Sequence, residues 1–279
     1  MQILRCGRFE LDVTRPRIMA IINVTPDSFS GDGLGRDLDA ALRRCEEAVK
    51  AGADLLDLGG ESTRPGSEPV SEQEELERVV PLVERLADWP VPVSVDTVKP
   101  GVMRASLAAG ASLINDVNGF LAPGAVDAIR DSDAAVCVMH MQGEPRSMQS
   151  KPQYEDVVGE VLAFLEQRVQ ELQGNGIDAS RITIDPGFGF GKTLDHNLAL
   201  FRALDRFVAT RWPVLIGVSR KTMLGAITGR PVAERTTASV AAALMAVERG
   251  ARIVRVHDVA ATRDALAIWE AVEKVTLPG

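Results

Sequence analysis

Polar side chains that could bind or react with a ligand follow each of eight short apolar runs in the sequence. They are Asn23, Glu61 with Ser62, Thr63 and Arg64, Asp96, Asn115 with Asp116, His140, Asp185, Ser219 with Arg220 and Lys221, and Arg255 with His257. One polar residue after a strand is common in any loop, whereas eight in succession indicate a shared site. We therefore expect these side chains to line the mouth where parallel strands run into their loops.

These side chains divide into two groups by their chemistry. The first offers acceptor oxygens and one amide donor that suit a flat heterocycle with several N–H groups: Asp96, Asn115 and Asp185. The second carries cationic or donor groups that suit a phosphate or diphosphate: Arg64, Arg255 and His257. Asn23 could orient a loop or donate an oxygen to Mg²⁺ on that phosphate. Lys221, the only lysine of the set, could pair with the ring or act as an electrophile.

Three local patterns point to other chemistries, and each is incomplete. Residues 187–193 imitate a phosphate-binding P-loop, but Pro186 stands where that motif needs its first glycine. We interpret them as a glycine-rich loop that lays Phe188 or Phe190 against a flat ligand, with simple loop packing as the alternative. Ser219 lacks the second glycine of a nucleophile elbow, which argues against a serine triad. The three histidines have no metal-ligand spacing, which argues against a zinc site.

The elements that must position these groups are short apolar or β-branched runs alternating with longer helix-like segments. The runs are Ile18–Ile22, Asp54–Leu58, Val93–Val95, Leu113–Asn115, Ala135–Met139, Ile182–Ile184, Val214–Gly217 and Ile253–Val256. This alternation predicts parallel strands with helical crossovers. Eight such units favour a closed (β/α)8 TIM barrel of the α/β class over an open doubly wound sheet, and no dinucleotide fingerprint follows the first run.

The opening segment, residues 1–14, alternates around Gly7 and predicts a β-hairpin that plugs the bottom of the barrel. Gly52, Gly110 and Gly250 each stand between a helix-like segment and the next run, where a left-handed cap turns the chain back toward the sheet. No segment has the composition of a linker. We therefore predict a single domain over residues 1–279.

Composition narrows the class of protein further. Of 279 residues, 46% are hydrophobic and 25% are charged, as in ordinary globular proteins. A formal net charge of −8 argues against nucleic acid and anionic membranes as partners, because both need a basic surface. Three cysteines without a CxxC motif indicate reduced thiols. No apolar stretch is long enough for a signal peptide or a membrane span, so we expect a cytoplasmic protein.

Eight segments match the pattern of one enzyme family. They are Asn23–Ser30, Gly59–Gly66, Ser94–Thr97, Ile114–Val117, Met139–Gly143, Asp185–Lys192, Gly217–Lys221 and Arg255–Asp258. With these segments in order along its whole length, the chain resembles the dihydropteroate synthases. The resemblance implies a barrel enzyme of folate biosynthesis that joins 6-hydroxymethyl-7,8-dihydropterin diphosphate to p-aminobenzoate, giving 7,8-dihydropteroate and pyrophosphate.

The resemblance also implies roles for individual residues. Those that would hold the pterin ring or pack on it are Asp96, Asn115, Asp185, Lys221, Met139 and Phe190. Those that would bind the diphosphate with Mg²⁺ are Asn23, Arg255 and His257, with Asn23 the metal ligand. Those that would form the p-aminobenzoate pocket are Phe29, Thr63, Arg64, Pro65, Ser219 and Lys221. Lys221, Arg255, His257 and Asn23 would be the catalytic set, and sulfonamides would compete at the p-aminobenzoate pocket.

This family's reaction needs no protein nucleophile. Pyrophosphate leaves while Mg²⁺ and the cations stabilise its charge, and the arylamine attacks the electron-deficient pterin methylene. One departure from the family pattern is Ser30-Gly31-Asp32-Gly33, where the family usually has Ser-Asp-Gly-Gly. We assign no role to Asp32.

Two other functions share part of this pocket. A pterin-binding barrel that transfers a methyl group to a corrinoid would need no diphosphate clamp, so Arg255, His257 and the Thr63–Pro65 segment count against it. A pterin-binding protein that has lost turnover would not need to keep Asn23, Arg64, Lys221 and His257, so these residues count against that reading. The resemblance further implies a homodimer through the last helices, where Val259, Leu266, Trp269 and Val272 are most simply explained by packing on the barrel.

Overall fold

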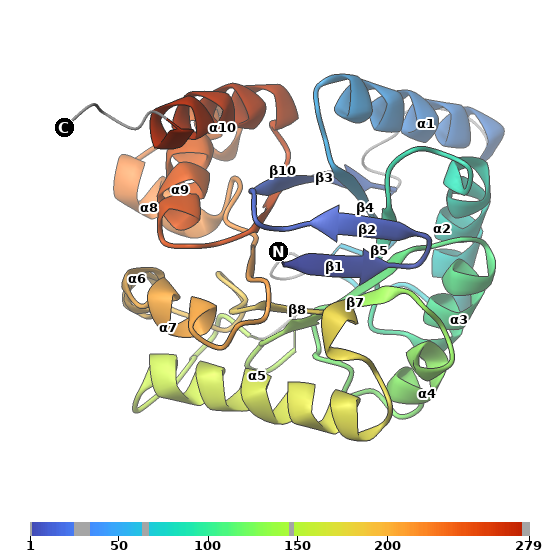
Figure 1. Ribbon diagram of the computed structural model, residues 1–279, viewed down its shortest axis with the longest axis horizontal. Helices are drawn as coiled ribbons and strands as arrows, with labels where there is room; N and C mark the ends of the chain where they lie inside the picture. Colours follow the sequence, from blue (N-terminus) through green and yellow to red (C-terminus); the bar gives the residue numbers. More distant parts are fainter. Residues whose placement is uncertain (1, 25–33, 63–66, 145–147, 275–279) are drawn as a thin grey trace.

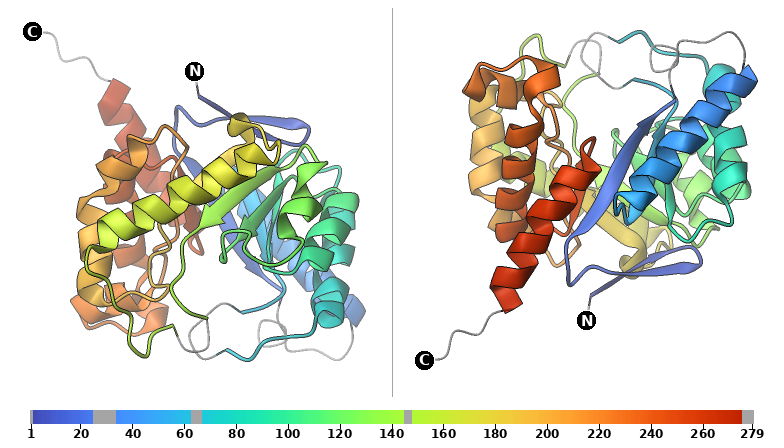
Figure 2. Two further views of the ribbon diagram at one scale, coloured as in Figure 1. Left: turned by 90° about the horizontal axis from the view of Figure 1, so that it is seen from below. Right: turned by 90° about the horizontal axis from the view of Figure 1, so that it is seen from above.

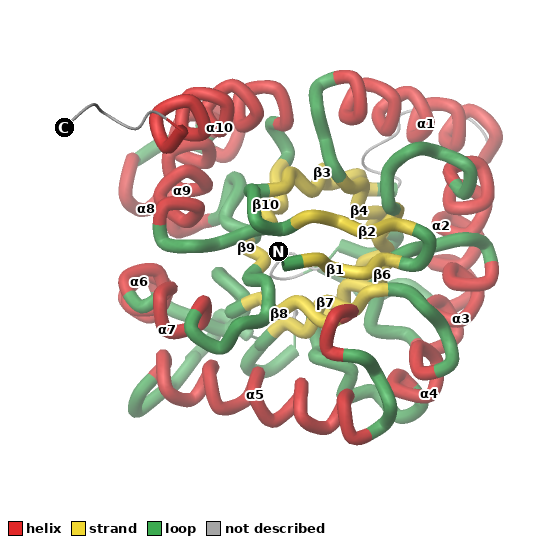
Figure 3. The backbone as a smooth tube through the Cα atoms, viewed as in Figure 1, coloured by secondary structure: helices red, strands yellow, loops and turns green. Residues whose placement is uncertain are grey.

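The computed structural model describes residues 2–24, 34–62, 67–144 and 148–274. Eight parallel strands form one sheet in the order β8-β7-β6-β5-β4-β3-β10-β9. A further parallel bridge joins Ile184 to Val214, beside the first residue of β9, and so connects the two ends of this order. The strands therefore close into a barrel with the helices around it, and this confirms the predicted fold class (Figures 1 and 3).

The barrel strands occupy the eight predicted runs to within a residue or so at either end. They are β3 (Arg17–Asn23), β4 (Leu55–Gly59), β5 (Val93–Asp96), β6 (Leu113–Asp116), β7 (Ala135–Met139), β8 (Ile182–Asp185), β9 (Leu215–Ile216) and β10 (Ile253–Val256). Their continuous apolar character follows from burial on both faces, since one face meets the helices and the other fills the barrel.

Helices connect successive strands. They are α1 (Leu34–Lys50), α2 (Glu72–Leu86), α3 (Pro100–Ala108), α4 (Ala125–Arg130), α5 (Val157–Gly174), α6 (Leu194–Arg202), α7 (Leu204–Val208), α8 (Thr222–Thr228), α9 (Thr236–Glu248) and α10 (Val259–Lys274), with short 3₁₀ turns η2 (Ala179–Arg181) and η3 (Val232–Glu234). Gly52, Gly110 and Gly250 have φ of 97°, 110° and 98°, which confirms the predicted left-handed turns before β4, β6 and β10. No helix in these described ranges is both long and apolar enough to cross a membrane.

A hairpin of β1 (Ile3–Cys6) and β2 (Phe9–Asp12) covers one end of the barrel, as Figure 2 shows. Leu4, Cys6 and Leu11 of this hairpin share an apolar cluster with the first inward-facing residues of the barrel strands, among them Met19 and Leu55. The strands begin at this end, so their carboxyl ends open at the opposite end. The hairpin thus covers the amino-terminal end of the barrel with apolar side chains, and a ligand site is expected at the opposite end, where the strands run into their loops.

Candidate active site

The inward-facing residues change from apolar to polar along the strands. Side chains alternate between the two faces of a strand, so residues two apart face the barrel interior together. On β10 the order is Ile253, Arg255 and then His257 just past the strand, and on β6 Leu113 is followed by Asn115. The hairpin end of the interior is therefore apolar, and the mouth is polar.

A buried cation with two carboxylates lies at the centre of the barrel. Arg255 Nε donates to Asp57 Oδ2 at 2.5 Å, and Arg255 Nη2 donates to Asp96 Oδ2 at 2.8 Å. Ser94 Oγ donates to the other oxygen of Asp57 at 2.5 Å. Burial alone lowers the pKa of Arg255, but the two carboxylates raise it above its ordinary value, so the guanidinium stays charged. These bonds use two of its five N–H donors.

Two acceptor atoms in this region are left for a ligand. Asp96 Oδ1 and Asn115 Oδ1 are buried and accept no hydrogen bond from any described residue. Asp96 and Asn115 are neighbours in the parallel pairing of β5 with β6. Burial raises the pKa of Asp96 to about 7, helped by Asp57 and opposed by Arg255. Unpaired buried acceptors each cost about 1–3 kcal/mol, which a ligand with matching N–H groups would recover.

Asp185 ends β8 and begins the glycine-rich loop. Its Oδ1 accepts the Gly187 N–H at 2.7 Å, and its side chain is buried. Burial raises the pKa of Asp185 to about 6, whereas the Gly187 N–H and the charge of Lys221 oppose the rise. Gly187 has φ of 71°, and a Cβ there would overlap the carbonyl oxygen of His140, so this position needs glycine.

An apolar surface lies beside these polar groups. Met139 and Phe190 share a buried cluster with Val117 and Met148. Lys221 Nζ lies 3.9 Å from the centroid of the Phe190 ring, which is a cation–π contact. Burial and the charge of Arg255 lower the pKa of Lys221 to about 8. A flat ring thus has an aromatic face, a cation and acceptor oxygens within one region.

Ser219 and His257 lie together at the mouth. Ser219 Oγ lies 3.0 Å from His257 Nδ1 and accepts the His257 backbone N–H at 3.2 Å. The Ser219 hydroxyl therefore holds the imidazole ring through Nδ1, and Nε2 lies on the side of the ring away from Ser219. Asn23 is the last residue of β3 and pairs in register with Gly59 of β4.

Comparison with known proteins identifies the family. Residues 19–257 match the family model described as pterin binding enzyme. The chain is 51% identical over 275 residues to dihydropteroate synthase of Neisseria meningitidis serogroup C, covering 97% of each protein. The chain belongs to the dihydropteroate synthase family.

Solved structures of this family agree with the fold. Dihydropteroate synthase of Burkholderia cenocepacia, complexed with 7,8-dihydropteroate, is 55% identical with a TM-score of 0.88, covering 98% of this chain and 96% of that chain. The Yersinia pestis enzyme in a sulfonamide drug complex is 45% identical with a TM-score of 0.93, covering 98% of this chain and 100% of that chain. The resemblance inferred from the sequence motifs is thereby confirmed.

Some predicted site residues are placed and others are not. Phe29, Thr63, Arg64 and Pro65 lie outside the described residues, as does the Gly31–Gly33 segment. Asp116 also follows a predicted strand, but its side chain binds its own loop. Its two oxygens accept the backbone N–H groups of Asn118 and Phe120 at 2.7 and 2.8 Å. Asp116 thus shapes its own loop.

Two residues without a predicted role also shape this candidate site. Asp57 lies inside a predicted apolar strand, and a carboxylate in such a run needs a buried partner, which is the signal that identifies it. Lys192 belongs to the P-loop-like pattern and to the segment Asp185–Lys192, but neither gives it a role of its own. It is buried inside the loop after β8.

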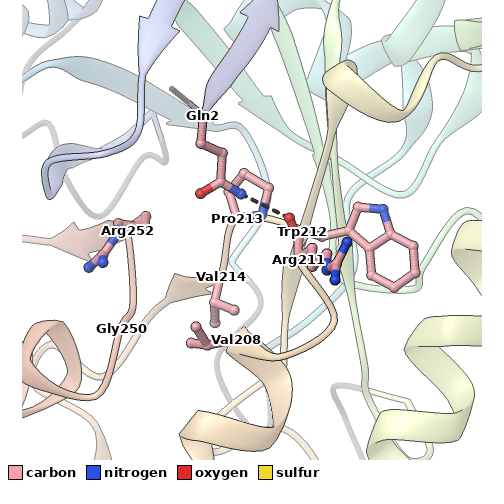
Figure 4. A pocket seen from close by; sticks show the side chains of 8 residues that line it. All are labelled: Gln2, Val208, Arg211, Trp212, Pro213, Val214, Gly250 and Arg252. Carbon is pink, nitrogen blue, oxygen red and sulfur yellow. Dashed lines mark hydrogen bonds between the residues drawn. The ribbon is translucent and has the colours of Figure 1, made fainter.

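A cavity of about 400 Å³ lies at the opposite, amino-terminal end of the barrel (Figure 4). Its lining residues are Gln2, Val208, Arg211, Trp212, Pro213, Val214, Gly250 and Arg252. Gln2 Nε2 donates across it to the carbonyl of Arg211 at 2.9 Å. None of the predicted site residues that the structure describes lines this cavity, so it is separate from the part of the candidate active site described above.

Proposed function

We propose that the chain condenses 6-hydroxymethyl-7,8-dihydropterin diphosphate with p-aminobenzoate, giving 7,8-dihydropteroate and pyrophosphate in folate biosynthesis. The observation that carries this proposal is the pair of buried acceptors without partners, Asp96 Oδ1 and Asn115 Oδ1, close to the cations of the barrel mouth. A pterin ring offers several N–H donors on one edge. Asp185, Asn115 and Asp96 would accept them, with Met139 and Phe190 packed on the ring.

The cations of the mouth would assist the departure of pyrophosphate. Lys221, Arg255 and His257 present N–H donors to negative charge that grows on the leaving oxygens. Ser219 orients the His257 ring. Arg255 is held by Asp57 and Asp96, so it meets the transition state without reorganisation. The amine of p-aminobenzoate then attacks the pterin methylene, and its proton passes to solvent or to the leaving group.

A magnesium ion fits this arrangement as a partner of the diphosphate. Mg²⁺ prefers oxygen ligands and commonly binds through one or two protein oxygens together with substrate phosphates and water. Asn23 supplies a neutral amide oxygen at the end of β3 and would hold the ion there. When bound, the ion supplies charge stabilisation for the leaving pyrophosphate.

The p-aminobenzoate pocket would be formed by Phe29, Thr63, Arg64 and Pro65 together with Ser219 and Lys221. Sulfonamides mimic the anionic aryl end of p-aminobenzoate, and they would bind the same pocket. The sulfonamide complex of the Yersinia pestis enzyme supports this expectation.

We further propose a homodimer in the cytoplasm. Five large exposed apolar side chains lie on α8, η3, α9 and α10, and α9 packs beside both α8 and α10 (Figure 1). They are Ile227, Val232, Met245, Ile268 and Val272, with exposed fractions of 45–69%. Val272, at 66%, therefore does not pack on the barrel as expected, whereas Val259 and Leu266 are buried. A second copy would bury this surface. The three cysteines are buried free thiols, in keeping with a reducing compartment.

Pyrophosphate release tests the proposed reaction. The purified chain is mixed with the pterin diphosphate, p-aminobenzoate and Mg²⁺, and release is followed against an enzyme-free control. We expect release that depends on p-aminobenzoate and declines when a sulfonamide is added. Pterin binding without release would indicate a binding protein, and absence of both would refute the proposal. Light scattering at several concentrations tests the dimer, which Ile268→Glu should dissociate.

A further inference from the structure

Lys192 is a buried lysine that the reaction described above does not use. Its side chain is almost fully buried, with 3% of the residue exposed. Its Nζ donates to the carbonyl oxygens of Gly187 at 2.9 Å, Phe190 at 3.0 Å and His140 at 3.2 Å. Burial lowers the pKa of Lys192 to about 7, and its charged form is stable in the interior only with such acceptors.

The imidazole of His140 supplies the fourth partner. Lys192 Nζ lies 3.0 Å from His140 Nδ1. Burial and the charge of Lys192 lower the pKa of His140 to about 3, so the ring is neutral. A charged Nζ has three N–H donors and no acceptor, so these four partners share three donors, and Nδ1 takes the accepting role when Lys192 is charged. Lys192 thus joins the residue after β7 to the loop after β8.

The atoms that Lys192 contacts lead directly to the predicted pterin-binding groups. Gly187 accepts from Lys192 through its carbonyl and donates its N–H to Asp185 Oδ1 at 2.7 Å. Phe190 accepts from Lys192 through its carbonyl and carries the ring beneath Lys221 Nζ. The Phe190 N–H also donates to the Gly187 carbonyl at 3.2 Å. A shift of the loop would therefore move the Asp185 hydrogen bond and the Phe190 ring together.

We propose that Lys192 is a positioning residue for pterin recognition: its ammonium group fixes the 187–191 loop so that Asp185 and Phe190 meet the ring. The proposal rests on the proposed function, because it concerns the same pterin site. Lys192 itself need not touch the substrate. Its removal would loosen the loop and weaken the binding of the ring.

The test measures ring binding and stability separately. Calorimetry with 6-hydroxymethylpterin, which lacks the diphosphate, reports on the ring alone, and thermal unfolding reports on the fold. Binding is measured at a temperature well below the melting temperature of each variant. For Lys192→Met we expect the affinity for 6-hydroxymethylpterin to fall about tenfold, because the groups that contact the ring would be displaced. Lys192→Gln keeps two N–H donors and should lose about threefold, which is partial rescue by a conservative change. Lys151→Met, at an exposed lysine, is the matched control and should bind like the unmodified chain.

The outcomes separate this inference from the proposed function. If the unmodified chain does not bind 6-hydroxymethylpterin, the proposed function fails. If it binds and the folded Lys192 variants bind within twofold of it, with only a lower melting temperature, Lys192 is structural and this inference is overturned. Should Lys192→Met fail to fold, Lys192→Gln decides by the same criterion. In turnover, the KM for the pterin diphosphate should rise more than kcat falls.

Discussion

Replacing Asp57 by asparagine tests the ion pair at the centre of the barrel. Asp57 is fully buried, and its carboxylate accepts from Arg255 Nε at 2.5 Å and from Ser94 Oγ at 2.5 Å. Asparagine has nearly the same shape but no charge. The change therefore removes one carboxylate of the Asp57–Arg255–Asp96 group and leaves the packing in place.

The expected loss of stability follows from burial. At an effective dielectric constant of about 20, a charge pair about 4 Å apart attracts by roughly 4 kcal/mol. Breaking a buried pair by removing one partner costs about 3–5 kcal/mol in measured cases. Asp96 still accepts from Arg255 at 2.8 Å, so we expect the lower end of this range, about 3 kcal/mol. For a chain of this size that corresponds to a melting temperature lower by roughly 6–12 °C.

Thermal unfolding followed by circular dichroism measures this effect. Asp127→Asn is the matched control, because its ion pair with Arg130 lies on the surface, with side chains 64% and 42% exposed, and should change nothing measurable. The double variant Asp57→Asn with Arg255→Met should lose less than the sum of the single losses, because each single change removes the same Asp57–Arg255 contact and the double variant loses it only once. An Asp57→Asn variant that melts with the unmodified chain would refute the reasoning.

Three further predictions concern the mouth of the barrel. Burial raises the pKa of Asp185 to about 6 and that of Asp96 to about 7, and ring N–H groups bind the ionised form of both. Affinity for 6-hydroxymethylpterin should therefore be greatest above about pH 8 and at least about tenfold lower at pH 5. Calorimetry across pH checks this, and a flat profile would contradict it. Lys221→Ala should lower kcat/KM in pyrophosphate release about 100-fold, through loss of a cation beside the reacting groups, without a matching change in melting temperature; normal kinetics would remove Lys221 from the site. Gly191→Ala should lower the free energy of unfolding by about 1–2 kcal/mol or more, measured by denaturant unfolding. Gly191 has φ of 62°, and a Cβ there would overlap the Gln142 carbonyl. Unchanged stability would show that the loop can move to accept the methyl group.

Much of the site could be predicted because strand ends are visible in a sequence. Asp96, Asn115 and Asp185 each end a short apolar run, and parallel strands in a barrel bring such ends to one mouth. The glycines that end helices, Gly52, Gly110 and Gly250, could also be predicted, because a left-handed turn favours glycine over other residues. Both signals depend only on neighbouring residues in the sequence, so they can be recognised without the tertiary structure.

Contacts between distant segments could not be predicted in this way. Asp57 and Arg255 are 198 positions apart, and the sequence around either residue does not predict that the other is its partner. Ser219 and His257 also meet only through the fold, 38 positions apart. Roles for Arg255, Ser219 and His257 could be predicted from residue type and the family resemblance, whereas the part of Asp57 and the pairing of all four residues came from the structure.

The sequence by itself determined the eight alternating units, the polar residue at each strand end and the family, because periodicity and residue type are local properties of the chain. Tertiary structure alone decided which charges pair inside the barrel and which acceptors stay open for a ligand. The reason is physical: burial and distance set the cost of an unpaired charge, and both are properties of the closed barrel. The same closure converts Lys192, a residue of a P-loop-like pattern, into the centre of a hydrogen-bonded loop.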